Sequence, residues 1–260
     1  ILLAYSNPGG YNMLSVLDDD IEINDLQYND NENSIVKQHG GVFTWQPDMW
    51  EWENGIKDSY ESTYTQIMGV NAVLDGVDDV EGSVEEKEVV KAQALGLRAY
   101  YYFMLVNLYG EPYNYNKKAL GVPLKLTSAL LENGITRNTV EEVYTRIVMD
   151  LEQASALFGK YSKRRGDFRI NGTATDILLS RVYLYMEEWD RAIEAANRAI
   201  KRAEGLTDYT TVEAGNQFYM TTYELSEVEW LFDMSITNFP FVPSGDLLSK
   251  YTNGDKRETL

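Results

Sequence analysis

The sequence predicts a mainly α-helical fold with long loops and little β structure. Apolar residues recur at helical spacing over several long stretches, whereas only residues 229–236 stand out as a short extended segment. Small residues recur at spacings of four and three in two of the helical stretches, which lets antiparallel helices approach closely. We therefore expect one domain over residues 1–260, with helical hairpins at about 50–109 and 139–204.

The composition excludes several classes of function. A formal charge of −18 over 260 residues repels phosphate backbones, so nucleic acid is not an expected partner. The chain has no Cys and a single His, which excludes disulfides, thiolate nucleophiles and zinc sites built on Cys or several His. No uninterrupted apolar run approaches the roughly 18 residues of a membrane span.

The first half of the chain predicts a polar loop followed by two helices. Residues 18–48 are dense in Asp, Asn, Gly and Gln, which disfavour long helices, so we expect a loop excursion there. Apolar residues at helical spacing then predict helices over about 50–76 and 84–109. Gly110 is expected to end the second helix as a left-handed cap, and Pro112 cannot continue it.

The second half predicts a further helix and a packed repeat. Thr139 and Glu142 have the spacing of a capping box. The helix that follows carries one apolar face, formed by Val143, Ile147, Leu151, Ala154 and Phe158.

Residues 171–200 match the tetratricopeptide pattern, in which small residues mark the points where two helices cross. The pattern consists of Leu179, Ser180, Tyr183, Ala192, Ala196 and Ala199, and Ala92, Gly96 and Ala99 repeat its spacing in the earlier helix. An irregular tetratricopeptide-like helical repeat therefore fits the sequence best. We expect its aromatic residues to lie in the core, namely Tyr100, Tyr101, Tyr102, Tyr183 and Trp189.

Several segments in a fixed order resemble the SusD/RagB family. They are LRAYYYFMLVNLYGEP followed by GVPL, then NGTATDILLSRVYLYMEEWDRA, EWLFDMSI and the closing Tyr251 with GDKR. The resemblance implies a surface lipoprotein of the outer membrane that binds a nutrient, a glycan in the main, and delivers it to a TonB-dependent SusC-like porin. It implies contact with the membrane only through a lipid anchor upstream of Ile1. Family members are normally longer than this chain.

A catalytic function has little support in the sequence. His39 lies in a Gly-rich turn without a nucleophile motif, and no phosphate-binding Gly-rich motif occurs. The run Asp18, Asp20, Glu22 and Asn24 alternates like calcium ligands, but the Gly and Glu that an EF-hand loop requires are absent. We expect no enzyme activity, no cofactor and no metal. A glycosidase carboxylate pair stays open, because its separation is spatial.

A binding function fits the aromatic residues near the polar loop. Sugar rings stack on Trp or Tyr, while Asn, Asp and Gln bind their hydroxyl groups. The candidate ligand-binding residues are accordingly Trp45, Trp50, Trp52, Asp48 and Asn54. These aromatics could instead cover the helical core. The alternative function is a helical-repeat scaffold that contacts a protein and has no glycan site.

Overall fold

The structure, a computed structural model, describes residues 21–23, 41, 43–47, 59–130, 134–161, 169–203, 241–252 and 254–255. The chain divides into two compact units, and each is described by itself. The first comprises Ile1–Ser6, Thr63–Leu206 and Tyr223–Leu231, and the second comprises Asn7–Ser62, Thr207–Thr222 and Phe232–Leu260. The expectation of one domain over residues 1–260 stays a prediction.

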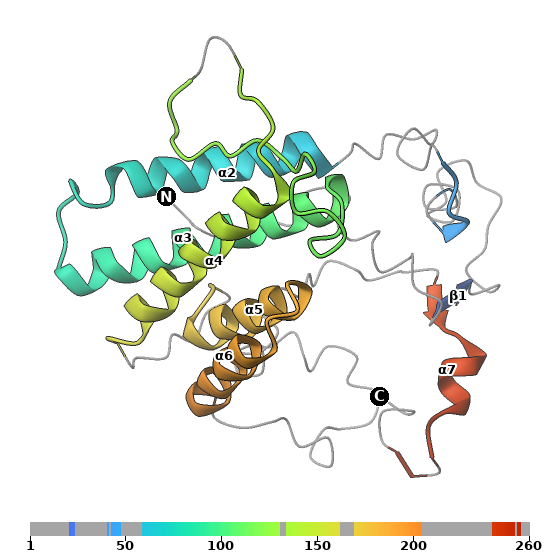
Figure 1. Cartoon of the computed structure of the whole chain (residues 1–260). Coiled ribbons are helices and arrows are strands. Elements are labelled where there is room, and N and C mark those ends of the chain that lie inside the picture. The colour runs from blue at the N-terminus through green and yellow to red at the C-terminus, as the bar shows by residue number, and fades with distance from the viewer. Residues whose placement is uncertain are drawn as a thin grey trace, which may run out of the picture. The chain divides into compact units, whose positions relative to one another are not determined.

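Helices dominate the described part of the first unit, as Figure 1 shows, and the prediction of a mainly α fold is confirmed. Successive helices pack against one another, with α3 on α4, α4 on α5 and α5 on α6. The helices are α2 (Ser59–Gly76), which belongs to this unit from Thr63 onward, α3 (Val84–Tyr109), α4 (Val140–Phe158), α5 (Gly172–Tyr185) and α6 (Trp189–Arg202).

Side-chain caps fix where three of these helices begin. Ser83 accepts a hydrogen bond from the Glu86 backbone N–H, and the Glu86 carboxylate accepts one from the Ser83 N–H, so α3 begins with a full capping box. The capping box predicted at Thr139 and Glu142 is confirmed at the start of α4. The Asn171 side chain caps α5. The backbone N–H groups in the first turn of a helix have no partner within the helix. Because each cap side chain accepts a hydrogen bond from one of them, the cap fixes where the helix begins.

Gly110 ends α3, but the predicted left-handed conformation is wrong. Its φ of −113° and ψ of 172° are extended, a conformation open to any residue. Glycine is required for a different reason, since a Cβ at this position would lie 2.7 Å from the Val106 carbonyl oxygen. The close approach of the backbone, rather than the torsion angle, explains this glycine.

The core of the first unit is centred on α3. Tyr100, Tyr101, Tyr102 and Tyr183 are buried there, as predicted. The small residues of α3 have the packing role that their spacing predicted. Ala92 and Ala99 are fully buried, and a Cβ added to Gly96 would lie 2.7 Å from the Ile170 Cδ1 atom.

The α5–α6 hairpin packs closely at small residues, with one correction to the predicted set. Ala192 and Ala199 are buried as expected, and the Ser180 hydroxyl donates to the Ala192 carbonyl at 2.9 Å. The third buried position is Ala195, whereas Ala196 is partly exposed. One residue turns the side chain by about 100° around a helix, which moves Ala196 off the contact face.

The described part of the second unit is small. Strand β1 (Ile21–Ile23) pairs antiparallel with β2 (Phe241–Pro243), and the short helix α7 (Gly245–Ser249) follows. The segment predicted as a polar loop at 18–48 therefore includes a three-residue strand. The extended segment predicted at 229–236 lies outside the described residues. None of the helices in the described ranges combines the length and apolarity that crossing a bilayer requires.

Candidate functional site

Trp45 is the one predicted ligand-binding residue within the described ranges. Asp48, Trp50, Trp52 and Asn54 lie outside them. The Trp45 side chain is 66% exposed. Its backbone φ of 54° is in the left-handed region, which a bulky residue seldom adopts. An indole held outward at a strained backbone position is a candidate platform for a ligand.

Hydrogen bonds define the turn that carries Trp45. The Gln46 backbone N–H donates to the Gly41 carbonyl at 2.9 Å, which closes the chain around residues 41–46. The Gln46 side-chain amide donates to the Thr44 carbonyl and hydroxyl, both at 3.3 Å. The turn thus presents an aromatic ring next to an amide, the pairing that sugar binding uses.

Trp189 also lies on the surface, although the sequence predicted it as core. It begins α6 and is 57% exposed. Ile193 and Ile200 follow at spacings of four and seven residues, so the three side chains share one face of the helix, and they are 58% and 72% exposed. We call these three residues the α6 stripe. The position of Trp189 in the repeat did not by itself reveal that its side chain is exposed among the described residues.

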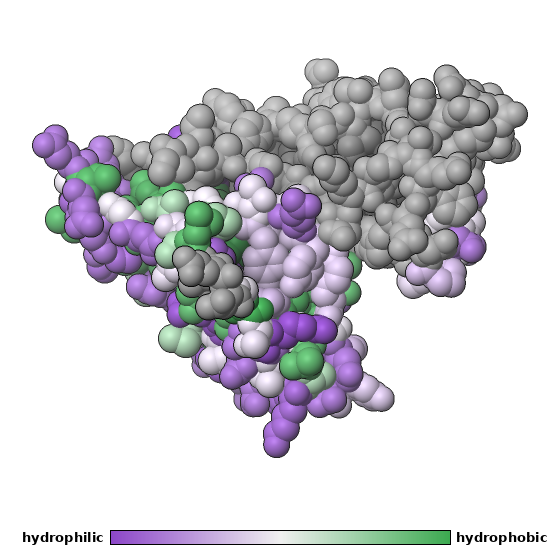
Figure 2. Space-filling model, turned by 90° about the horizontal axis from the view of Figure 1, so that it is seen from above, coloured by the Kyte–Doolittle hydropathy of each residue, from purple (hydrophilic) through white to green (hydrophobic). Residues whose placement is uncertain are grey.

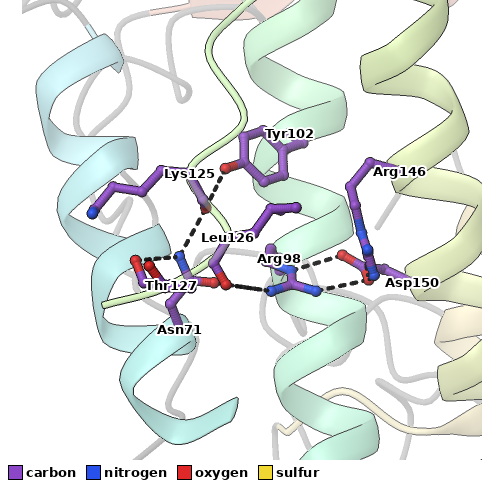
Figure 3. A network of polar contacts seen from close by, with 8 residues as sticks. All are labelled: Asn71, Arg98, Tyr102, Lys125, Leu126, Thr127, Arg146 and Asp150. Carbon is purple, nitrogen blue, oxygen red and sulfur yellow. Dashed lines mark hydrogen bonds and ion pairs between the residues drawn. The ribbon is translucent and has the colours of Figure 1, made fainter. Parts of the chain in front are cut away.

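A buried polar network joins α2, α3 and α4, as Figure 3 shows. The Arg98 guanidinium donates to both Asp150 carboxylate oxygens, at 2.7 and 2.9 Å, and to the Asn71 side-chain oxygen at 3.0 Å. Arg146 also donates to Asp150. Because Arg98 and Asp150 are almost fully buried, each charge depends on these partners.

The same network holds the loop after Gly121. The Lys125 carbonyl accepts hydrogen bonds from the Asn71 amide at 2.8 Å and from the Tyr102 hydroxyl at 2.6 Å. The Tyr64 hydroxyl donates to the Pro123 carbonyl at 2.6 Å. Burial of Tyr102 raises its pKa, so the hydroxyl stays a donor. These residues therefore have a structural role, with all partners supplied by the chain.

A second buried carboxylate joins α4, α5 and α6. Asp176 accepts a hydrogen bond from the Ser155 hydroxyl at 2.6 Å and one from Arg198 at 3.2 Å. Arg202 forms an ion pair with its other oxygen at 3.2 Å. Within the described ranges, no three acidic or histidine side chains converge as metal ligands.

Among the residues coloured by hydropathy in Figure 2, hydrophilic ones predominate on this face, and hydrophobic ones form small groups between them. Tyr115, in the loop after α3, is an aromatic residue with an 81% exposed side chain. The patterns used in the sequence analysis did not identify it. Its position between Asn114 and Asn116, three residues after Pro112, was the available signal.

Comparison with known proteins identifies the family. The model of the SusD-like family described as "Starch-binding associating with outer membrane" matches residues 12–184. The SusD-like protein P25 of Formosa agariphila is 22% identical over 183 residues, which are 69% of this chain and 32% of that protein.

Solved structures agree with this match. A putative sugar binding protein from Bacteroides vulgatus is 31% identical, with a TM-score of 0.61, over 73% of this chain and 40% of that one. A SusD-like carbohydrate binding protein from the same organism is 22% identical, with a TM-score of 0.64, over 86% of this chain and 46% of that one. The chain thus spans less than half the length of these relatives. It belongs to the SusD-like family.

Proposed function

We propose that the protein binds an oligosaccharide without chemically changing it and delivers it to a TonB-dependent porin at the outer-membrane surface. The family match supports glycan binding, and the observation that carries the proposal is the exposed indole of Trp45. An apolar ring in water has no packing role within the turn, but it fits the C–H face of a sugar.

The ligand site of this proposal comprises Trp45, Trp50 and Trp52 as stacking residues, with Asp48 and Asn54 as hydrogen-bonding partners for sugar hydroxyl groups. The acidic chain supports a neutral glycan as ligand, because a net charge of −18 repels sulfated or uronic acid polymers. Membrane attachment through a lipid anchor and the porin as partner are proposed from the family resemblance.

Calorimetric titration of the protein and its Trp45→Ala variant tests the binding proposal. The titrants are linear α-glucan and β-glucan oligosaccharides, with short peptides as a control. We expect Trp45→Ala to weaken the best interaction by about 2 kcal/mol, as loss of a stacking ring at a binding centre does. Trp189→Ala is the matched control, because that indole is similarly exposed but lies on a helix without neighbouring amides. If the two substitutions change glycan affinity equally, Trp45 is not part of the ligand site.

The α6 stripe favours a second candidate function, a scaffold that contacts a protein. Exposed apolar side chains aligned on one helix face are typical of protein contact surfaces. A scaffold of this kind binds no glycan in the titration above. Under the first proposal, pull-down with the purified partner porin should succeed together with glycan binding. Under the second, a protein is bound while the glycan titration stays flat.

A further inference from the structure

The loop between α3 and α4 holds an exposed aromatic residue on a rigid support. Tyr115 is 81% exposed and lies between Asn114 and Asn116, which are also exposed. The Asn114 side-chain amide donates to the Tyr185 carbonyl at 3.4 Å, so the loop lies against the end of α5. Tyr185 is itself 53% exposed. We call Asn114, Tyr115, Asn116 and Tyr185 the Tyr115 surface.

Backbone hydrogen bonds fix the conformation of this loop. The N–H groups of Tyr115 and Asn116 both donate to the Pro112 carbonyl, at 3.0 and 3.3 Å. The Ala119 carbonyl accepts from Val140 and the Lys117 carbonyl accepts from Glu141, both at 2.9 Å. The loop is thereby tied to the first turn of α4.

Arg137 fixes the two ends of the same loop. Its guanidinium donates to the carbonyl groups of Tyr109 at 3.0 Å, Leu120 at 2.8 Å and Gly121 at 2.6 Å. Tyr115 is therefore presented by a backbone that is ordered before any ligand arrives. Binding to such a surface loses little conformational entropy.

Aromatic side chains that pack on one another connect the Tyr115 surface to the core. The Tyr113 ring lies 4.7 Å from Tyr144, and Phe103 contacts Tyr144 at 6.1 Å and Tyr185 at 5.1 Å between ring centroids. Lys117 lies 4.5 Å above the Tyr113 ring. Tyr113 is buried while Tyr115, two residues later, is not, so the loop divides its two tyrosines between the core and the solvent.

The unused polar groups of the surface match a sugar. Neither the Tyr115 hydroxyl nor the Asn116 side-chain amide forms a hydrogen bond with another described residue. A flat ring flanked by free amide and hydroxyl groups can stack on the C–H face of a pyranose and bind its hydroxyl rim.

The α6 stripe is different in chemistry, because it is formed by two Ile residues and a Trp on a helix face. A protein contact favours such aliphatic area, whereas the Tyr115 surface alternates an aromatic ring with amides. We propose that the Tyr115 surface is a second contact site for an oligosaccharide, in addition to the Trp45 turn. This inference rests on the proposed function.

The test uses the full chain with maltoheptaose and laminarihexaose as probes, by calorimetric titration and thermal melting. For the probe that binds better, Tyr115→Ala should weaken affinity about fivefold or more, since a ring contact is lost. Tyr115→Phe should stay within about twofold, since the stacking area is kept. Leu120→Ala is the control, because Leu120 is an exposed apolar residue of the same loop without flanking amides. None of the three should shift the melting temperature.

Each outcome decides between the inference and the proposed function. If the parent protein binds a probe and Tyr115→Ala binds it equally well, the inference is wrong and the proposed function stands. If the parent protein binds neither probe, both are wrong. If Tyr115→Ala leaves glycan affinity unchanged but abolishes capture of the purified porin, the surface contacts protein, which also overturns the inference. A fivefold loss in Tyr115→Ala that Tyr115→Phe does not share supports it.

Discussion

Arg98 on α3 and Asp150 on α4 form a bidentate ion pair in the core, with nitrogen–oxygen distances of 2.7 and 2.9 Å. The side chain of Asp150 is fully buried and that of Arg98 is almost fully buried. The pair also orients Asn71, which binds the Lys125 carbonyl. Three helices, α2, α3 and α4, and the loop after Gly121 are therefore linked through the Asp150 carboxylate.

We predict that Asp150→Ala lowers the free energy of unfolding by about 3–5 kcal/mol, because it leaves buried Arg98 without its counter-charge. Urea unfolding followed by circular dichroism measures the change. The matched control is Asp78→Ala, which removes the surface pair between Asp78 and Lys91, at 2.8 Å in the parent. That change should cost about 0–1 kcal/mol. Similar losses in the two variants would contradict the buried role of Asp150.

Two helical glycines should respond to alanine in opposite directions. Gly96→Ala places a methyl group 2.7 Å from the Ile170 Cδ1 atom, so we expect a loss of about 1–3 kcal/mol from overpacking. A methyl group added to Gly69 in α2 would meet no described atom within 4 Å, and Gly69→Ala should gain about 0.5–1 kcal/mol of stability. Thermal melting compares the two.

A second substitution tests the cause of the Gly96 effect. Ile170→Val removes the Cδ1 atom that the new methyl group would meet. Ile170→Val should therefore lower the free energy of unfolding by less in the Gly96→Ala variant than in the parent protein, with a difference of about 0.5 kcal/mol or more. Additive losses would show that the contact between the two sites is not the source of the effect.

The packing of the α5–α6 hairpin should distinguish two neighbouring alanines. Ala195 is fully buried, so Ala195→Leu should destabilise the protein by about 1–3 kcal/mol. Ala196 is partly exposed, and Ala196→Leu should change stability by no more than about 0.5 kcal/mol. Differential scanning calorimetry of the pair settles which alanine lies at the crossing. A larger loss at Ala196 would restore the contact face predicted from the repeat pattern.

The ion pair between α3 and the end of α4 should make stability depend on pH. Hydrogen bonds from Lys160 and then Tyr161 hold the pKa of Glu88 below its ordinary value of 4.5. Because the folded pKa is depressed, this stabilisation is present above pH 4.5 and is lost as pH falls through the folded value. Glu88→Gln should therefore flatten the acid side of the stability profile, as melting curves at a series of pH values would show.

Tyr161→Phe provides the matched variant for this pair, because it removes one of the two donors to Glu88. In that variant the pKa of Glu88, followed by NMR of its carboxyl carbon, should move toward 4.5. The hydrogen bond to Glu88 raises the pKa of Tyr161 to about 12, so on the alkaline side the stabilisation is fully present below pH 10 and is lost as the pH rises from 10 through about 12. A Glu88 carboxyl that titrates at or above 4.5 in the parent protein would contradict the pair.

Periodic features of the fold could be predicted from the sequence, and features that depend on distant partners could not. The bounds of α3 and the capping box at Thr139 follow from local spacing, and both are confirmed. Arg98 and Asp150 are 52 residues apart, so their pairing has no local signal. The need for glycine at position 110 likewise comes from the close approach of the Val106 carbonyl oxygen, which the residue type alone does not reveal.

The candidate site could be predicted only in part. The Trp45 indole is exposed, as a ligand platform requires, while Trp50, Trp52, Asp48 and Asn54 stay predictions. The burial predicted for Trp189 is wrong because the tetratricopeptide pattern specifies which residues face the partner helix but not whether another layer covers the outer face. Tyr115 was overlooked because loop residues lack the periodicity on which the other predictions rest.

Because the α6 stripe is exposed on an acidic protein, we expect self-association to depend on ionic strength. At low salt a net charge of −18 keeps molecules apart, whatever apolar area they expose. At about 1 M salt the Debye length falls to roughly 3 Å, and the repulsion no longer prevents Trp189, Ile193 and Ile200 of two molecules from meeting. We therefore expect the acidic residues to keep the protein dispersed, and buffers for storage and for binding measurements should have low ionic strength.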